Sequence, residues 1–448
     1  MIKFNWETEF KQTEIGKVPR EWGVRKLECA IESLETGNRP KGGSLQYDPK
    51  GILSIGGENI SWEGDLILDG CLRFAESFYN SLKRGRIKER DILLVKDGAT
   101  IGKLAFIKNV PEGRAMVNEH VFLIRTNEKE YHPRFLFYFL FSDAGQLQIE
   151  SLISGSAQGG INRSILDTIK IPKFDFTEQS RIATVLSWFD DLIENKKRQN
   201  EILEKVAMAI FKSWFVDFEP FKDEEFVYSE ELGKEIPMGW EVKPIGEVAE
   251  FYKGISYKGS EKFYSKTGSE KELVFITLDN ILRGGGFKIN YTWIISERIK
   301  KHQLLREIDL IIANTDMTQE AKVIGSPAIV TFPIDYYKEY GVYSHHITKI
   351  IPRDEIYRLY LYVFLKLTQD ENTTFSTGTN VLGLDIENFK RNKFVLLPPR
   401  DLHGKFHSLV EPLFQKIILN QKQIMVLRKI RDALLPKLVF GKLRVVEI

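Results

Sequence analysis

The chain has 448 residues, of which 43% are hydrophobic and 28% charged, a balance that excludes a disordered polymer and provides for two or three domains with apolar cores. The formal net charge is only +2, so any affinity for nucleic acid has to come from local basic patches. Cys29 and Cys71 form no CxxC pair, which argues against a disulfide framework and a cysteine zinc site.

The N-terminal segment is polar, and no run of about 18 apolar residues occurs anywhere in the chain. We therefore expect a cytoplasmic protein without a membrane partner. Each half of the chain then opens alike, which indicates an internal duplication. The matching residues are Gly16-Lys17-Val18-Pro19 with Trp22 in the first half, and Gly233-Lys234 and Ile236-Pro237 with Trp240 in the second.

The same order of predicted elements follows in both halves. An apolar run led by aspartate predicts a buried strand, a short aromatic helix comes after it, and a loop rich in Ser, Gly and Thr follows the helix. The strands are expected at 91–95 and 309–313, the helices at 135–141 and 357–365, and the loops at 154–158 and 376–380.

Each half ends in a long helix whose apolar residues repeat at spacings of four and three. Such a seam needs another helix to cover it, and the other copy is the obvious partner. The seam residues, which we also consider for partner docking, are Ile182, Leu186, Phe189, Ile193, Leu203, Ile210 and Trp214 in the first helix, and Phe406, Val410, Leu413, Ile417, Leu427, Leu434 and Leu438 in the second.

Polar residues interrupt both seams. Lys196 and Asn200 break the first, Asn420 breaks the second, and Arg431 stands where the first helix has Ala207. Polar residues at such positions cost stability but can fix the register of paired helices. We expect an α+β fold in which two β-rich globular units with short helices are separated by two long, antiparallel, coiled-coil-like helices.

This order of elements resembles the specificity subunit of Type I restriction-modification enzymes over nearly the whole chain. The resemblance is carried by the duplicated opening, the stretch from Leu93 to Lys103, the loop Gly155-Ser156-Ala157-Gln158, the pair Glu178-Gln179 and the segment from Ala209 to Phe215. It implies two target recognition domains, at 1–175 and 223–399, and two conserved spacer helices, at 176–222 and 400–448.

The resemblance further implies a chain that reads the two halves of an interrupted site in double-stranded DNA and has no catalytic role. The helices would dock two methyltransferase subunits, and restriction subunits would join that core. No cofactor is expected on this chain: AdoMet belongs to the methyltransferase, and ATP and Mg to the restriction subunit. A helix of about 38 residues extends ~57 Å, more than one DNA turn of roughly 34 Å, and could serve as a spacer.

A basic stretch in the first half is the best candidate for phosphate contacts. It contains Lys83, Arg84, Arg86, Lys96 and Lys103. The alternative interpretation is a solvated strand edge, where lysines also prevent aggregation.

The Ser/Gly/Thr loops are the candidates for base reading, because amide, hydroxyl and guanidinium groups can recognise base edges. In the first half the candidates are Ser156, Gln158, Asn162 and Arg163; in the second they are Thr377, Thr379 and Asn380. Asn314 and Thr315, in the counterpart of the turn at Lys96, are further candidates for DNA contact. A plain flexible turn remains the alternative.

Other motifs predict no catalytic or metal site. The stretch Gly98–Lys103 is one residue short of a nucleotide-binding loop. His403 and His407 have helical metal spacing but no accompanying Glu, so capping or surface positions are expected. His345 and His346 lie in a strand-like stretch, where neighbours would point to opposite faces.

Two other classes remain open: a single-chain DNA-modifying enzyme with unrecognised motifs, and a coiled-coil adaptor. Binding of AdoMet by the isolated chain would favour the first. Persistent absence of DNA binding, even with a methyltransferase present, would favour the second.

Overall fold

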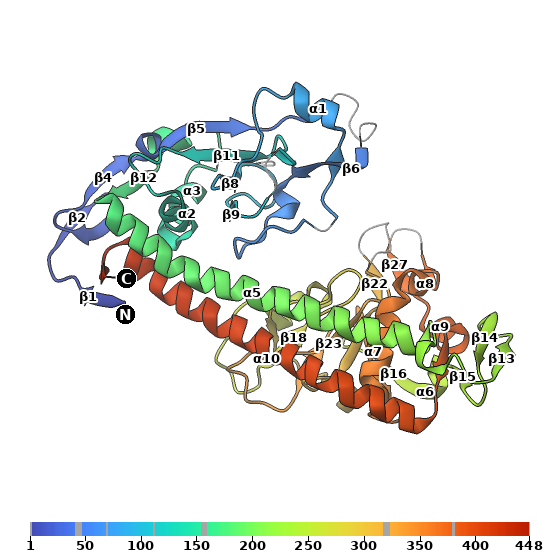
Figure 1. The fold of residues 1–448 in the computed structure, drawn as a ribbon. Coiled ribbons are helices and arrows are strands. Elements are labelled where there is room, and N and C mark those ends of the chain that lie inside the picture. The colour runs from blue at the N-terminus through green and yellow to red at the C-terminus, as the bar shows by residue number, and fades with distance from the viewer. Residues whose placement is uncertain are drawn as a thin grey trace. The chain divides into compact units, whose positions relative to one another are not determined.

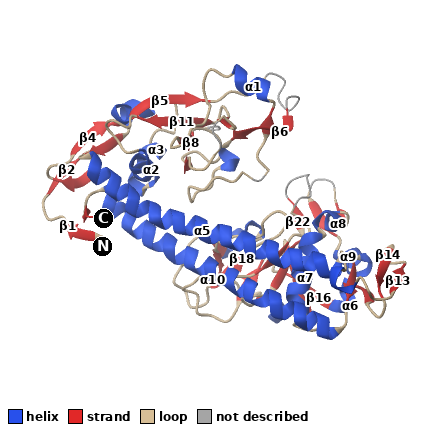
Figure 2. Cartoon of the chain, viewed as in Figure 1, coloured by secondary structure: helices blue, strands red, loops and turns tan. Residues whose placement is uncertain are grey.

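The computed structural model of the chain describes residues 2–40, 47–68, 70–110, 113–153, 159–316, 323–378 and 381–447. Contacts within the chain divide it into two compact units: unit 1 comprises Met1–Leu192 with Arg428–Ile448, and unit 2 comprises Ile193–Leu427 (Figure 1). Each unit contains strands, short helices and a segment of both long helices (Figure 2). The α+β fold class is thus confirmed, and the boundaries at 175, 222 and 399 stay predictions.

Short elements make up the globular part of unit 1. In chain order they are β1 (Lys3–Trp6), β2 (Phe10–Thr13), β3 (Gly16–Pro19), β4 (Gly23–Lys26), β5 (Ile31–Thr36), β6 (Tyr47–Ile55), β7 (Arg73–Phe74), α1 (Glu76–Ser81), β8 (Ile92–Val95), β9 (Leu104–Phe106), β10 (Ala115–Val117), β11 (Val121–Thr126), α2 (Pro133–Phe141), α3 (Asp143–Glu150), α4 (Ile165–Thr168), β12 (Lys170–Lys173) and β29 (Leu443–Glu447).

Unit 2 contains a corresponding series. Its elements are β13 (Phe226–Ser229), β14 (Lys234–Pro237), β15 (Glu241–Pro244), α6 (Ile245–Val248), β16 (Ala249–Lys253), β17 (Lys262–Phe263), β18 (Leu273–Ile276), β19 (Thr292–Ile294), β20 (Leu304–Leu305), β21 (Leu310–Ala313), β22 (Thr315–Asp316), β23 (Pro327–Ile329), β24 (Gly341–Tyr343), β25 (Ile347–Pro352), α7 (Tyr357–Leu367), α8 (Gln369–Thr373), β26 (Ser376–Thr377), β27 (Leu382–Leu384), α9 (Ile386–Asn392) and β28 (Phe394–Leu397).

The duplication seen in the sequence is repeated in the sheets. Unit 1 has a four-stranded antiparallel sheet in the order β5-β11-β8-β9, and unit 2 has β16-β25-β21-β23 in the same order. A second sheet contains a parallel pair in both, β6 with β10 and β18 with β24. The two central strands predicted from the sequence are β8 and β21, and all residues of both are buried.

The long helices are α5 (Phe176–Phe215) and α10 (Arg400–Val439), each of 40 residues and about 60 Å long. They pack against each other within each unit in an antiparallel sense. In unit 1 Asp190 contacts Arg431, and in unit 2 Asn200 contacts Asn420 while Phe211 packs on Phe406. The expected pairing of the two copies is thus present.

Seam residues of both helices contribute to the cores. In unit 1 Ile182, Leu186 and Leu438 are fully buried, and Phe189 and Leu434 pack at the edge of the same cluster. In unit 2 the core contains Phe406 and Val410, with Ile210, Trp214, Leu413 and Ile417 partly buried around it. Ile193 is buried, and Leu203 and Leu427 are half-buried.

Polar contacts fix the start of α5. Arg444 of β29 donates from Nη2 to Glu178 Oε2 at 2.7 Å. The fully buried Gln179 accepts a hydrogen bond from the backbone of His132 at 3.0 Å and donates to the Phe174 carbonyl at 3.0 Å. The Glu-Gln pair noted in the sequence therefore has a structural role here.

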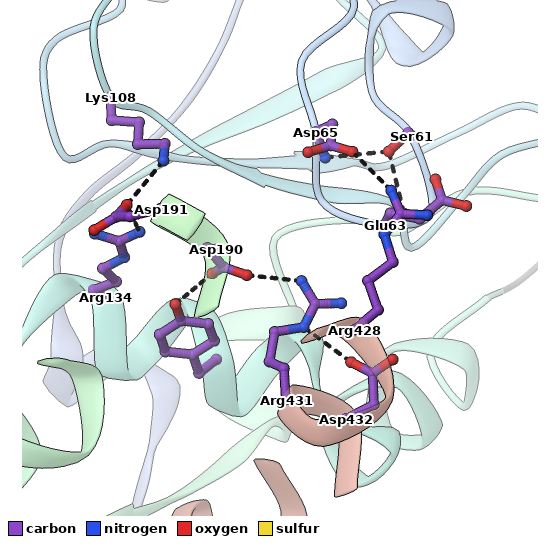
Figure 3. A network of polar contacts seen from close by, with 11 residues as sticks. Ser61, Glu63, Asp65, Lys108, Arg134, Asp190, Asp191, Arg428, Arg431 and Asp432 are labelled. Atoms are coloured by element: carbon purple, nitrogen blue, oxygen red, sulfur yellow. Dashed lines mark hydrogen bonds and ion pairs between the residues drawn. The ribbon is translucent and has the colours of Figure 1, made fainter. Parts of the chain in front are cut away.

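A charged network joins the globular part of unit 1 to both long helices (Figure 3). Asp190 accepts hydrogen bonds from Tyr138 of α2 and from Arg431 of α10, the latter at 2.8 Å. The neighbouring Asp191 pairs with Lys108 and Arg134 at 3.1 and 3.2 Å. Because Arg431 is almost fully buried, its charge is stabilised by two carboxylates, Asp190 at 2.8 Å and Asp432 at 2.9 Å.

Candidate nucleic-acid interface

The central sheet of each unit contains a largely buried ion pair. The Asp91 carboxylate, 1% exposed, accepts from Nε and Nη2 of Arg125 at 3.0 and 2.9 Å. In unit 2 Asp309 lies 3.9 Å from Lys349. Burial raises the pKa of both carboxyls despite these cations. The pairs join the start of β8 to β11 and the start of β21 to β25.

A charged cluster in unit 1 lies where β8 ends and β11 begins. Lys96 Nζ lies 2.6 Å from Asp97 Oδ2, and His120 Nδ1 contacts the other carboxylate oxygen. His120 Nε2 lies 3.3 Å from Glu119, which also pairs with Arg39 at 2.9 Å. Burial acts to raise the pKa of Asp97, but the hydrogen bonds from Lys96 and His120 outweigh it and the pKa is lowered. Asp97 is therefore ionised and orients both of its partners.

The segment after the first Ser/Gly loop is fastened to this cluster. Gly160 pairs with Asp97 in an isolated bridge, and the Ile161 amide donates to the Lys96 carbonyl at 2.7 Å. Asn162 and Arg163 follow directly and are exposed. The fold thus brings three of the predicted residues, Lys96, Asn162 and Arg163, onto adjoining segments.

Unit 2 repeats the arrangement with different side chains. Thr315 Oγ1 lies 2.8 Å from His346 Nδ1, where unit 1 has Asp97 and His120. The rings of His345 and His346 lie 3.9 Å apart. Burial lowers the pKa of His346, and His345 and Lys253 lower it further, so its imidazole is neutral at neutral pH.

The second Ser/Gly/Thr loop is also tied to the strand end. Thr315 pairs with Gly383 across β22 and β27, and the Leu384 amide donates to the Asn314 carbonyl at 2.7 Å. Thr377, on β26, is exposed, and its hydroxyl donates to the Gly383 carbonyl at 3.3 Å. Both units therefore place a histidine, a strand end and a loop segment together.

The remaining candidates fall into three groups. Lys83 and Arg84 are exposed beside α1, and Lys103 lies over the half-exposed ring of Trp62 at 5.9 Å. Arg86 is used internally: it donates to the carbonyls of Tyr79 and Asn80 at 3.1 and 2.9 Å. Ser156, Gln158, Thr379 and Asn380 lie outside the described residues.

Asn314 is 5% exposed, and its amide donates to the His345 carbonyl at 3.4 Å. This position suits holding the turn better than reaching a ligand.

A groove of about 730 Å³ adjoins the cluster of unit 1; its lining includes Asn38, Arg39, Ser77 and Glu119.

Sequence reasoning did not place His120 or His346 among the candidate site residues, and its expectations for His345, His346 and His403 were wrong. His345 and His346 lie in the turn before β25, with their rings together, so the expected strand with opposed side chains is wrong. His403 is fully buried against Tyr357 and Tyr360 and is no surface residue. The signal available for His120 and His346 was their shared place immediately before a buried strand in each half.

Within the described ranges, no three His, Cys, Asp or Glu side chains gather closely enough to hold a metal ion. No helix in the same ranges is both long and apolar enough to cross a membrane. The clusters instead present hydroxyl, imidazole, amide and basic groups, which is the chemistry that contacts phosphates and base edges.

Comparisons with known proteins agree with the duplication. The profile of the Type I restriction modification DNA specificity domain matches residues 19–205 and again 237–428. The Type I restriction enzyme MjaIX specificity subunit of Methanocaldococcus jannaschii is 36% identical over 100% of this chain and 99% of its own length. The HindI specificity subunit of Haemophilus influenzae is 24% identical over 80% of this chain and 87% of its own length.

Among solved structures, the S subunit of a Type I system from M. genitalium aligns over 93% of this chain and 96% of its own chain, with 18% identity and a TM-score of 0.48. The family assignment rests on the twofold profile match and on the full-length relative. This chain therefore belongs to the specificity subunits of Type I restriction enzymes and carries their DNA specificity domain twice.

Proposed function

We propose that this chain reads the two halves of an interrupted site in double-stranded DNA, one half with each unit. The observation that carries the proposal is the repeated cluster: Lys96, Asp97 and His120 in unit 1, Thr315 and His346 in unit 2. The backbone arrangement around the two clusters is alike, whereas their side chains differ. Each unit is therefore suited to a different short DNA sequence.

Contacts divide between two kinds of residue in this proposal. Lys83, Arg84 and Lys103 are exposed or half-exposed cations suited to phosphates, which position the protein without reading sequence. The candidates for base edges are His120, Asn162, Arg163, Thr315 and His346, together with the loop residues Ser156, Gln158, Thr377, Thr379 and Asn380. Arg86 and Asn314 would stabilise the backbone near the clusters through their hydrogen bonds to carbonyl groups.

The chain would have no catalytic centre of its own and would work in the cytoplasm. Two methyltransferase subunits carrying AdoMet would dock on the long helices, and restriction subunits using ATP and Mg would join them. Since the seam side chains are largely taken up by packing within the chain, the docking residues would be the apolar ones on the outer faces, such as Ile202, Val206, Val426 and Ile430. Methylation would require the target adenine to leave the DNA stack.

The test is genome-wide mapping of methylated bases in cells that express this chain together with a Type I methyltransferase subunit. We expect one split motif, with two half-sites at a fixed gap, that disappears when the chain is deleted. A continuous motif, or methylation that does not depend on the chain, contradicts the proposal.

A binding assay on the assembled complex adds residue-level evidence. Arg163→Ala should weaken binding to the mapped site by about tenfold, because one charge-assisted contact is lost. Lys11→Ala is the matched control: Lys11 is an exposed cation on β2, which contributes nothing to the cluster. Equal losses in the two variants would assign Arg163 to general electrostatics.

A further inference from the structure

The two long helices are copies that differ at the positions where they touch. Lys196 of α5 and Asn420 of α10 are 224 residues apart, and the same offset relates the first residues of the two helices and their last residues. By this offset Asp190 corresponds to Phe414, and Ala207 corresponds to Arg431.

At one end of the helix pair the contact is ionic, and at the other it is apolar. In unit 1 the buried Arg431 donates to Asp190 at 2.8 Å, and Tyr138 donates to the same carboxylate. In unit 2 the corresponding Ala207 and Phe414 both belong to the core, and Tyr362, the counterpart of Tyr138, packs edge-on against Phe414 with ring centroids 5.1 Å apart.

In the middle of the helix pair, too, the polar side chains are arranged for contact between α5 and α10. Asn420, fully buried, donates from Nδ2 to Asn200 Oδ1 at 2.9 Å, and its Oδ1 lies 3.5 Å from Lys196 Nζ. By the same offset Asn200 corresponds to Ile424. In a pair of two α10 helices Asn420 would therefore face Ile424 and the second Asn420, and in a pair of two α5 helices two Lys196 ammonium groups would meet.

We propose that these differences make each long helix select the unlike copy, so that α5 pairs with α10 and neither helix pairs with its own copy from a second chain. In an α5 pair Asp190 would face Ala207 and keep only the hydrogen bond from Tyr138. In an α10 pair Arg431 would face Phe414 and keep only the exposed Asp432 of its own helix, at 2.9 Å. Loss of the ionic partner across a buried helix contact is costly enough to weaken pairing of like helices by at least about a hundredfold. The selection does not depend on DNA binding.

The experiment uses the full chain with a protease site placed in the exposed turn at 222–225, between α5 and β13. Cleavage of the folded protein gives an N-terminal fragment with α5 and a C-terminal fragment with α10. The nicked protein is unfolded in urea and refolded, so that the helices choose partners afresh, and the pairs are weighed by native mass spectrometry. We expect the mixed pair to exceed either like pair at least a hundredfold.

Two variants test the residues. Asp190→Phe with Arg431→Ala copies the Phe414 and Ala207 arrangement into unit 1, and should raise the fraction of like pairs at least tenfold. Asp190→Arg with Arg431→Asp keeps an ion pair of reversed direction and should retain the selection. This control shows whether a double substitution at these positions raises the fraction of like pairs by misfolding alone. The proposal is overturned if the mixed pair does not dominate in the refolded parent protein. It is also overturned if the first variant leaves the fraction of like pairs unchanged.

Discussion

Asn420 of α10 donates a hydrogen bond to Asn200 of α5 at 2.9 Å, in the middle of the seam between the two long helices. Asn420 is fully buried and also lies within 3.5 Å of Lys196, so several polar groups depend on it. A buried polar group that loses its partner carries the full cost of its desolvation.

Asn420→Ala should therefore lower the free energy of unfolding by about 1–3 kcal/mol. Urea titration followed by circular dichroism measures the change. The double variant Asn200→Leu with Asn420→Leu removes both polar groups and should recover most of the loss, because apolar residues then fill the seam. A double variant as unstable as the single one would show that the hydrogen bond is not the cause.

His120 and His346 should affect different halves of the recognised site. Each lies in the cluster of one unit, beside Asp97 and Thr315 respectively. His120→Ala should weaken discrimination in one half-site by about 1–3 kcal/mol, equivalent to about 5- to 160-fold in relative binding, and His346→Ala in the other. Competition binding with single-base variants of the mapped site measures this. Loss in both half-sites from one substitution would contradict separate reading.

His403 should make unit 2 sensitive to acid. It occupies the position that corresponds to Gln179, but its two ring nitrogens have no hydrogen-bond partner among the described residues, and burial lowers its pKa to about 4. A base whose pKa is depressed on folding stabilises the fold fully above its unfolded value of about 6.5, and this contribution is lost as pH falls toward 4. The loss reaches about 3 kcal/mol at most.

Melting temperature measured from pH 7 to pH 4 checks this expectation. His403→Gln restores the residue found in the first helix and should flatten the acid limb of the profile. His407→Gln is the control, since His407 is half-exposed on the same helix and pairs with Glu411 at 3.4 Å. If the parent chain and His403→Gln lose stability equally on acidification, the buried imidazole is not responsible.

The long helices should determine the gap between half-sites if they act as the spacer. Deleting residues 193–199 of α5 together with 421–427 of α10, which run opposite them, removes about 10 Å of helix pair. That length corresponds to about three base pairs. Methylation mapping should then show a shortened gap or loss of modification, whereas an unchanged gap would rule out the helices as the spacer.

Arg125 should be necessary for the fold of unit 1. Arg125→Ala leaves the Asp91 carboxylate buried without its bidentate partner and should cost about 3–5 kcal/mol of stability. Lys3→Ala, which removes the exposed pair with Glu447, should cost less than about 1 kcal/mol. Chemical denaturation of both variants decides this, and similar small losses would mean that water replaces Arg125.

The sequence by itself determined the duplication, the two long helices, their seam and the family. These features are periodic or local: a heptad pattern requires a helical partner, and an apolar run led by aspartate in each half became β8 and β21. The polar interruptions at Lys196, Asn200 and Asn420 were visible too, and the tertiary structure brings them together.

Only the tertiary structure decided which side chains form the candidate site. His120 meets Asp97 and His346 meets Thr315 across strands that are distant in sequence, and no spacing rule predicts such contacts. The sequence suggested that Arg86 and Asn314 contact DNA, but in the structure their side chains donate hydrogen bonds to backbone carbonyls of the same chain. Residue type gives the chemistry of a group, whereas burial and long-range hydrogen bonds determine whether that group is free to meet DNA.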